Sequence, residues 1–414
     1  MISANNGGQY IGVGKGGHAN KHGYMDNSTA GFATNVVGLP PNFNGNLLPG
    51  KWLNRGRKCK LGSTDMAPSR DSVKMYEDLC RFQVAEVLRS FIPGALKGIS
   101  IPVLELVDCS ARRIFVLDAM KIEQQSISGN LMGIKYAVEE ELEITPEAGM
   151  EKLILIGGDQ LLKDRVRTIM KQRESDVPGE NFESIHAMLG MLHTMMNFAK
   201  MICKHHLGKM ATKDPSSLRF CNTILGLERL DEKATNFWNT QTLIRRCIMA
   251  FLMCLLVRQG GFSTLESFQK SFAEDGSYVH AEEGPKTLEG LVEKVCEMLA
   301  FTRVATMREE EEDKRDVVLE NMLLFIRLGI QFIGMYDAMR RGDVGVMQRI
   351  LDCLTAQFIG GDHHKYATEL MDISCGFKAE WSEELCRVRY ISEYRSLRVG
   401  YRRVQWLTQN VTGR

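Results

Sequence analysis

The stretch Glu151–Gln160, EKLILIGGDQ, determines which fold class this chain can adopt. Its apolar run Leu153–Ile156 is closed by two glycines, which is the pattern of a short, fully buried strand. Asp159 comes next, at the strand exit where open α/β sheets place their chemistry. The following residues, Leu161–Arg173, have helical spacing and carry five basic side chains. The sequence therefore predicts a strand, an acid and a basic helix in that order.

Two interpretations of Asp159 follow from this context. In the first, its carboxylate binds a metal ion, and Arg165, Arg167 and Lys171 on the next helix contact a polyanion. In the second, Asp159 caps the helix by accepting a hydrogen bond from a backbone N–H of the first turn. Residue types alone leave both interpretations open.

The composition indicates a folded, soluble, intracellular protein. Of 414 residues, 44% are hydrophobic and 25% are charged, so a sizeable core can be buried. The net charge of +1 excludes a global field that attracts nucleic acid or membranes, so any such binding needs a local patch. The 11 cysteines form no CxxC pair, which favours a reducing compartment. The longest apolar run, Cys247–Val257, is too short to span a bilayer and predicts a buried helix, so no membrane partner is expected.

Apolar periodicity places a sheet layer before a helical block. Strands are expected near residues 9–13, 32–37, 101–107, 114–118 and 153–156, and helices over 71–91 and 131–142. His186–Cys203 is expected to begin as a strand and continue as a helix, and residues 218–358 show almost only helical spacing. The predicted class is a mixed, helix-rich α/β fold. The predicted parts are an irregular segment with short strands (1–70), a sheet-containing core (71–210), a helical insertion (211–360) and a C-terminal helical segment (361–414).

Two further patterns call for interpretation. Gly12–Gly17 matches G-x-G-x-x-G, but no helix start and no GK[ST] follows, so we expect a loop without a phosphate role. Histidines occur in adjacent pairs and no HExxH is present, which disfavours a zinc site.

The C-terminal stretch Arg387–Arg414 combines arginines with aromatic residues. It has seven arginines, a single acid, Glu393, and interleaved tyrosines and a tryptophan. Arginines for phosphate and aromatics for base stacking are typical of a nucleic-acid-binding surface. The alternative is an amphipathic helix whose aromatics pack inward. The candidate contacts are Arg387, Arg395, Arg398, Arg402 and Arg403.

Seven short motifs also occur in a characteristic order along the chain. They are SISGN (126–130), GDQ (158–160), LHTMMN (192–197), DPSSL (214–218), AMRRGDVG (338–345), KYATEL (365–370) and WLTQNVTG (406–413). This order resembles a transposon-derived family known only as a domain of unknown function. Members of that family are similar to DDE-type transposases with a ribonuclease-H-like core.

The resemblance implies a ribonuclease-H-like sheet interrupted by a long helical insertion. In such a fold, three carboxylates bind two divalent ions about 3.5–4 Å apart, which activate water for phosphodiester attack. Oxygen ligands suit Mg²⁺, which is the implied cofactor. The resemblance assigns Asp159 to the end of a central strand, His193 to the next strand, Glu369 as the third acid and Asp343 behind it.

One departure bears on activity. Where the family carries an acid on its first strand, this sequence has Asn5 and Asn6, and neutral amides do not bridge two cations as carboxylates do. We therefore expect a transposon-derived nuclear protein that binds DNA, and we leave open whether it retains Mg²⁺-dependent nuclease or strand-transfer activity. The alternative is a non-catalytic helical scaffold or protein-interaction domain.

Overall fold

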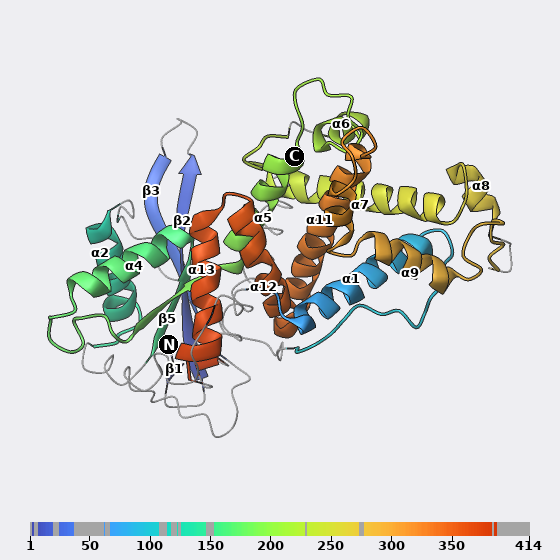
Figure 1. Cartoon of the computed structure of the whole chain (residues 1–414). Helices are drawn as coiled ribbons and strands as arrows, with labels where there is room; N and C mark the ends of the chain where they lie inside the picture. Colours follow the sequence, from blue (N-terminus) through green and yellow to red (C-terminus); the bar gives the residue numbers. More distant parts are fainter. Residues whose placement is uncertain are drawn as a thin grey trace, which may run out of the picture.

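The structure is a computed structural model of the whole chain (Figure 1). It describes residues 2–3, 7–19, 25–36, 62, 67–106, 114–116, 122, 126–145, 153–227, 230–272, 277–382 and 385–386. The fold is mixed α/β and rich in helices, as the sequence predicts. In Figure 1 the sheet with α2 and α4 lies on the left, and the helical block extends to the right.

One sheet runs through the first half of the chain in the order β4-β3-β2-β5-β6, with β1 beside β2. Strands β2, β3 and β4 form an antiparallel meander, whereas β2 pairs in parallel with β5 and β5 in parallel with β6. The strands are β1 (Ile2–Ser3), β2 (Gly7–Ala19), β3 (Met25–Val36), β4 (Ile114–Val116), β5 (Ile154–Gly158) and β6 (Ile185–Leu189).

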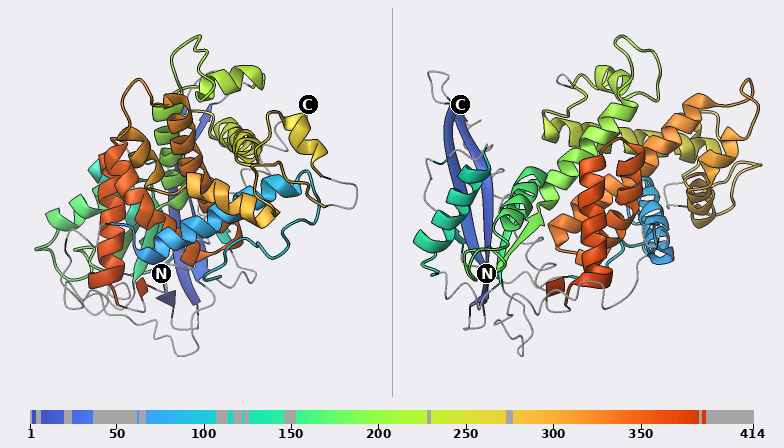
Figure 2. Two further views of the ribbon diagram at one scale, coloured as in Figure 1. Left: turned by 45° about the vertical axis from the view of Figure 1, so that its right-hand side comes forward. Right: turned by 60° about the vertical axis from the view of Figure 1, so that its left-hand side comes forward.

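Strand β5 is buried on both faces, which explains its unbroken apolar run. Leu153 and Leu155 join the large core that also holds α5, α7, α11 and α12. Ile154 and Ile156 alternate to the other face and join a smaller core with α2 and α4. The sheet therefore lies between two helical layers. In Figure 1, α2 and α4 lie to its left and α5 and α13 to its right, and the right-hand view of Figure 2 shows the helical block extending to the right of the strands.

The helices confirm the helical spacing expected over residues 218–358. Two short π-helical turns extend α2 and α13. The helices are α1 (Arg70–Arg89), α2 (Ile127–Lys135), η3 (Tyr136–Glu140), α4 (Gln160–Gln172), α5 (Met191–His206), α6 (Leu218–Ile224), α7 (Phe237–Gln259), α8 (Leu265–Lys270), α9 (Leu288–Met298), α10 (Arg303–Arg308), α11 (Val317–Arg341), α12 (Val344–Gly360), α13 (His364–Cys375) and η4 (Gly376–Glu380).

Helices α7 and α11 are long and apolar enough to cross a membrane by length and composition. Their apolar windows are, however, 50% and 61% buried within the protein. Because core helices of soluble proteins have this character, the finding is compatible with a soluble protein.

Three local expectations differ from the structure. Gly12–Gly17 is part of β2 instead of a loop, because pairing with β3 and β5 outweighs the low strand propensity of glycine. Residues 101–106 form no strand of the sheet, and Leu106 makes an isolated bridge with Asp343. Helix α1, predicted at the start of the sheet-containing core, packs on α7, α9, α11 and α12 and so belongs to the helical block.

Candidate active site

Asp159 lies at the carboxyl end of β5 and caps helix α4. Its backbone is extended (φ −73°, ψ 174°), and its Oδ1 accepts a hydrogen bond from the backbone N–H of Leu162 at 2.8 Å. Gly158 permits this tight turn from strand to helix, since a Cβ there would lie 2.3 Å from the Leu162 side chain. The capping role considered from the sequence is therefore confirmed.

His193 lies near Asp159, but on a helix instead of a strand. Strand β6 ends at Leu189, and His193 occupies the first turn of α5 that follows. The resemblance placed it one element too early, because the LHTMMN motif begins after the strand has ended. Partial burial lowers the pKa of His193, and the charge of Asp159 opposes this shift. The two side chains therefore interact electrostatically at the carboxyl edge of the sheet.

Tyr366, from helix α13, reaches the same edge. Its hydroxyl lies close to the backbone at Gln160, the first residue of α4. Burial raises the pKa of Tyr366 to about 12, and the charges of Asp159 and Glu369 add to the shift. Tyr366 is thus close to both acids. No pattern in the sequence singles it out except its place in the KYATEL motif.

Glu369 is buried and bound by two basic side chains of α4. Lys163 Nζ lies 2.5 Å from Glu369 Oε2, and the exposed fractions of these two side chains are 4% and 2%. The guanidinium of Arg167 donates to both oxygens of Glu369. The second acid of α13, Asp372, accepts from Lys163 at 2.6 Å and from Arg167 at 3.0 Å. We call Lys163, Arg167, Glu369 and Asp372 the α4–α13 ion cluster.

The cluster contains two cations and two anions. Burial lowers the pKa of Arg167, but hydrogen bonds to Glu369 and the charge of Asp372 outweigh this and raise it overall. Lys163 and Glu369 form the buried end, and Arg167 and Asp372 the half-exposed end. The cluster joins α4, the helix after β5, to α13, the helix after the predicted insertion, and Glu369 is its residue from the KYATEL motif.

Asp343 lies in the corner between α11 and α12. Gly342 ends α11 with a left-handed conformation (φ 78°), and Asp343 caps α12 by accepting from the N–H of Val346 at 3.1 Å. The same carboxylate accepts from the N–H groups of Leu104 and Glu105 at 3.2 and 3.1 Å. Asp343 is fully buried and anchors the segment 101–106 through these bonds.

The predicted nucleic-acid contacts on α4 differ in exposure. Lys171 is exposed, Arg165 is half-buried, and Arg167 belongs to the α4–α13 ion cluster. Arg387, Arg395, Arg398, Arg402 and Arg403 lie outside the described residues, as do Asn5 and Asn6.

The described acids do not fit a two-ion Mg²⁺ centre. Strand β2, the central strand beside β5, contains no Asp or Glu over Gly7–Ala19. Its Gly12 pairs with Gly157, two residues before Asp159, so the neighbouring register positions are Gly14 and Lys15. No group of three or more His, Cys, Asp or Glu among the described residues is arranged to hold a metal ion.

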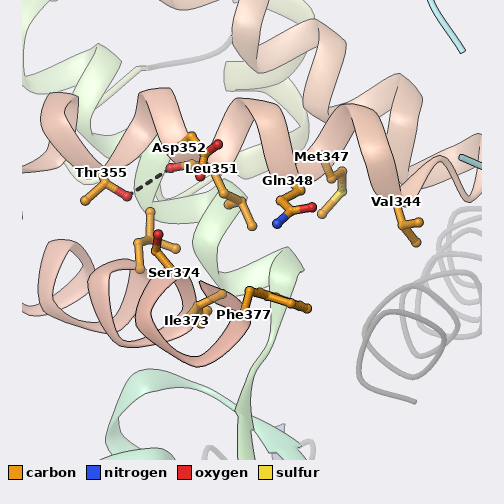
Figure 3. Close-up of a pocket in the computed structure, with 10 residues that line it drawn as sticks. Val344, Met347, Gln348, Leu351, Asp352, Thr355, Ile373, Ser374 and Phe377 are labelled. Carbon is orange, nitrogen blue, oxygen red and sulfur yellow. Dashed lines mark hydrogen bonds between the residues drawn. The ribbon is translucent and has the colours of Figure 1, made fainter. Parts of the chain in front are cut away.

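A cavity between α12 and α13 lies apart from these acids (Figure 3). Its volume of about 20 Å³ accommodates roughly one water molecule, so it is too small for an organic substrate. Asp352 lines it, and burial raises the pKa of this carboxyl although Ser72 donates a hydrogen bond to it. The lining residues are Val344, Met347, Gln348, Leu351, Asp352, Thr355, Leu370, Ile373, Ser374 and Phe377.

The buried side chain of His206, at the end of α5, should make the free energy of unfolding depend on pH. It packs edge-on against Phe325, with ring centroids 5.4 Å apart, and burial lowers its pKa to about 4, with the charge of His205 as a second cause. In the unfolded chain the pKa of histidine is about 6.5, so protonation favours unfolding. The stabilisation is complete above about pH 6.5 and falls by about 1.4 kcal/mol per pH unit down to about pH 4.

Urea unfolding at pH 7.5, 5.5 and 4.5 measures this effect. His206→Phe should unfold with a smaller loss of stability between pH 6.5 and 4 than the wild type. His280→Phe, which changes an exposed histidine, is the matched control and should keep the wild-type slope. Equal pH slopes for the wild type and His206→Phe would contradict the assignment.

Comparison with known families gives one match. A family described as a family of unknown function (DUF6589) matches residues 55–390. No curated protein and no solved structure matches the chain.

Proposed function

The chain belongs to the DUF6589 family, whose function is unknown, and we propose that it is a transposase-derived DNA-binding protein with a ribonuclease-H-like sheet. In this proposal the chain does not cleave DNA by a two-ion mechanism. The match over most of the sequence supports the family, and the sheet supports the transposase origin. The fold-level part of this proposal is an analogy, so the function has to be argued from the site.

The strand order is the single observation that carries the proposal. A ribonuclease-H-like sheet is expected to begin with an antiparallel meander of three strands and to add two parallel strands beside the first. The order β4-β3-β2-β5-β6, with its parallel pairs β2–β5 and β5–β6, agrees with that expectation. In this pattern β5 is the fourth strand, and Asp159 follows its carboxyl end next to the central strand β2.

The chemistry of the acids supports the loss of cleavage. Two-ion catalysis needs carboxylates that are free to bridge cations. Asp159 caps α4, Glu369 is bound by Lys163 and Arg167, and β2 supplies no acid. A protein that retains the scaffold without the metal centre can still bind DNA through basic residues, and the proposal includes a nuclear location.

DNA binding is tested by fluorescence anisotropy of the full chain with duplex DNA between 50 and 300 mM salt. We expect log K to fall linearly with log[salt], with a slope near −0.9 for each phosphate contacted. Replacing Arg395, Arg398, Arg402 and Arg403 together with alanine should make the slope less steep by about 3.6 if all four contact phosphate. Lys270→Ala, an exposed cation on α8, is the control and should leave the slope unchanged.

Cleavage is tested separately by nicking and strand-transfer assays in Mg²⁺ or Mn²⁺. We expect the wild type and Asp159→Ala to be equally inactive. Activity in the wild type that is lost in Asp159→Ala would restore the catalytic interpretation and overturn the proposed loss.

A second candidate, a non-catalytic scaffold or protein-interaction domain, is favoured by the structural roles of the acids. Under this alternative Asp159→Ala lowers the free energy of unfolding by about 0.5–2 kcal/mol through the lost cap and changes no binding. DNA affinity that is absent, or that does not respond to salt, would support this alternative against the first proposal.

A further inference from the structure

The carboxylates of α13 are already bound by cations of the chain itself. Lys163 Nζ contacts Glu369 at 2.5 Å and Asp372 at 2.6 Å, so a single ammonium group bridges two acids. A bridging cation between two carboxylates is the arrangement that a divalent ion would otherwise create. Here the bridging charge is covalently attached to helix α4.

This bridge lies beside Asp159. Lys163 follows Asp159 by four residues in α4, which places both on one face of the helix. Tyr366 is close to Asp159 and Glu369, since the charges of both acids raise its pKa. Glu369 is therefore linked through Lys163 and Tyr366 to the strand end where the proposed ribonuclease-H-like fold would bind a metal ion.

The charges explain why a metal ion would not enter. The four side chains of the cluster carry no net charge, and Asp164, 3.4 Å from Arg167, adds one acid at the half-exposed end. A divalent ion at Glu369 would meet the Lys163 ammonium within hydrogen-bonding distance of the same carboxylate, and like charges at this depth repel strongly. Binding would require Lys163 to leave a site in which its side chain is only 4% exposed.

We propose that Lys163 is a built-in replacement for a divalent cation, and that removing its charge converts the α4–α13 ion cluster into a divalent-cation site. That the α4–α13 ion cluster occupies a former metal site rests on the proposed function. The expectation that the cluster binds a divalent cation once Lys163 is removed rests only on the charges of its own residues. The residues expected to hold the ion in the variant are Glu369 and Asp372, which suit Mg²⁺ or Mn²⁺ as oxygen ligands. Arg167 keeps its hydrogen bonds to both acids, and without Lys163 the charges of Glu369, Asp372 and Arg167 sum to −1, which attracts a cation to the place that Lys163 leaves.

The test measures Mn²⁺ binding to the full chain by the loss of the free-ion electron paramagnetic resonance signal, together with the unfolding midpoint in Mn²⁺ and in EDTA. The proteins are the wild type, Lys163→Ala, and Lys163→Ala combined with Glu369→Gln. Lys171→Ala, which removes an exposed lysine from the same helix, is the control. Lys163→Met, which keeps most of the side-chain volume, replaces Lys163→Ala if the latter does not fold.

We expect Lys163→Ala to bind one Mn²⁺ at least tenfold more tightly than the wild type and to unfold several degrees higher in Mn²⁺ than in EDTA. The double variant and Lys171→Ala should show neither effect. A wild type that binds one Mn²⁺, with loss of that ion in Glu369→Gln, would overturn the proposal, even if neither Lys163 variant folds. A folded Lys163 variant without Mn²⁺ binding would also overturn it. Loss of the proposed DNA-binding function alone would leave these Mn²⁺ results unchanged, so the two failures are distinguishable.

Discussion

Replacing Glu369 with glutamine is expected to lower the free energy of unfolding by about 3–5 kcal/mol. The substitution preserves shape but leaves the Lys163 ammonium in a buried site with one carboxylate fewer. Removing one partner of a buried ion pair is strongly destabilising because the remaining charge is uncompensated. Asp372 limits the loss, since it still accepts from Lys163 at 2.6 Å, but its side chain is 43% exposed and only partly compensates. Urea unfolding at pH 7.5 measures the change.

An exposed ion pair provides the matched control for Glu369. Lys204 and Asp362 also join distant parts of the chain, at 2.8 Å, but their side chains are 44% and 67% exposed. Asp362→Asn should therefore lower stability by about 1 kcal/mol or less. The neutral double variant Glu369→Gln with Lys163→Met should be more stable than Glu369→Gln alone, because no unpaired charge remains. If Glu369→Gln costs no more than Asp362→Asn, the cluster does not hold α4 to α13.

The sequence predicts the strand–helix unit around Asp159 well because its signals are local. The apolar run, the two glycines and the helical spacing all act within about twenty residues, and both β5 and α4 form as expected. The change from strand to helix within His186–Cys203 is local in the same sense. Long-range pairing is not accessible in this way. The strand character of Gly12–Gly17 depends on β3 and on β5, which lies more than 130 residues further along the chain.

The candidate site also combines local features, which the sequence predicts, with long-range contacts, which it does not. Asp159 is predictable as either a cap or a ligand, and its capping bond to Leu162 is local. The partners of Glu369 lie 202 or more residues away in the sequence, so no spacing rule points to Lys163 or Arg167. The basic residues of α4 predict contact with a polyanion, whereas Arg167 binds acids of the same chain. Charge patterns in a sequence identify the groups that need partners but not which partners they find.

Several of the ordered motifs have structural explanations in helix capping. Ser126 of SISGN caps α2 by accepting from Gly129, and Asn130 donates back to the Ser126 carbonyl at 2.7 Å. Ser217 of DPSSL caps α6. These roles account for short motifs that combine serine, aspartate and glycine without requiring catalysis. Asp343 belongs to another of these motifs, and its carboxylate is a candidate both for capping α12 and for binding a metal ion.

Asp343→Ala is expected to lower the free energy of unfolding by about 3–5 kcal/mol. Lost capping of α12 contributes about 0.5–2 kcal/mol, and each backbone N–H left without an acceptor contributes about 1–3 kcal/mol more where water cannot reach it. Val346 loses the capping bond, the N–H groups of Leu104 and Glu105 lose their acceptor, and the Arg341 guanidinium, 3.9 Å from Asp343 Oδ2, loses its charge partner. Chemical denaturation in EDTA measures the change, so that bound metal cannot contribute.

Asp343→Asn separates the two roles because it removes the charge and keeps one acceptor. Oδ1 of Asp343 accepts from Val346 and Glu105, and the asparagine carbonyl can retain both bonds, whereas Leu104 donates to Oδ2 and loses its acceptor. We therefore expect Asp343→Asn to cost about 1–3 kcal/mol, clearly less than alanine, in EDTA and in Mg²⁺ alike. A metal ligand would behave differently, since an amide binds Mg²⁺ poorly: asparagine would then be as harmful as alanine, and only the wild type would gain stability from Mg²⁺. Equal losses for both variants, with a Mg²⁺ response confined to the wild type, would assign Asp343 to a metal site and not to the corner between α11 and α12.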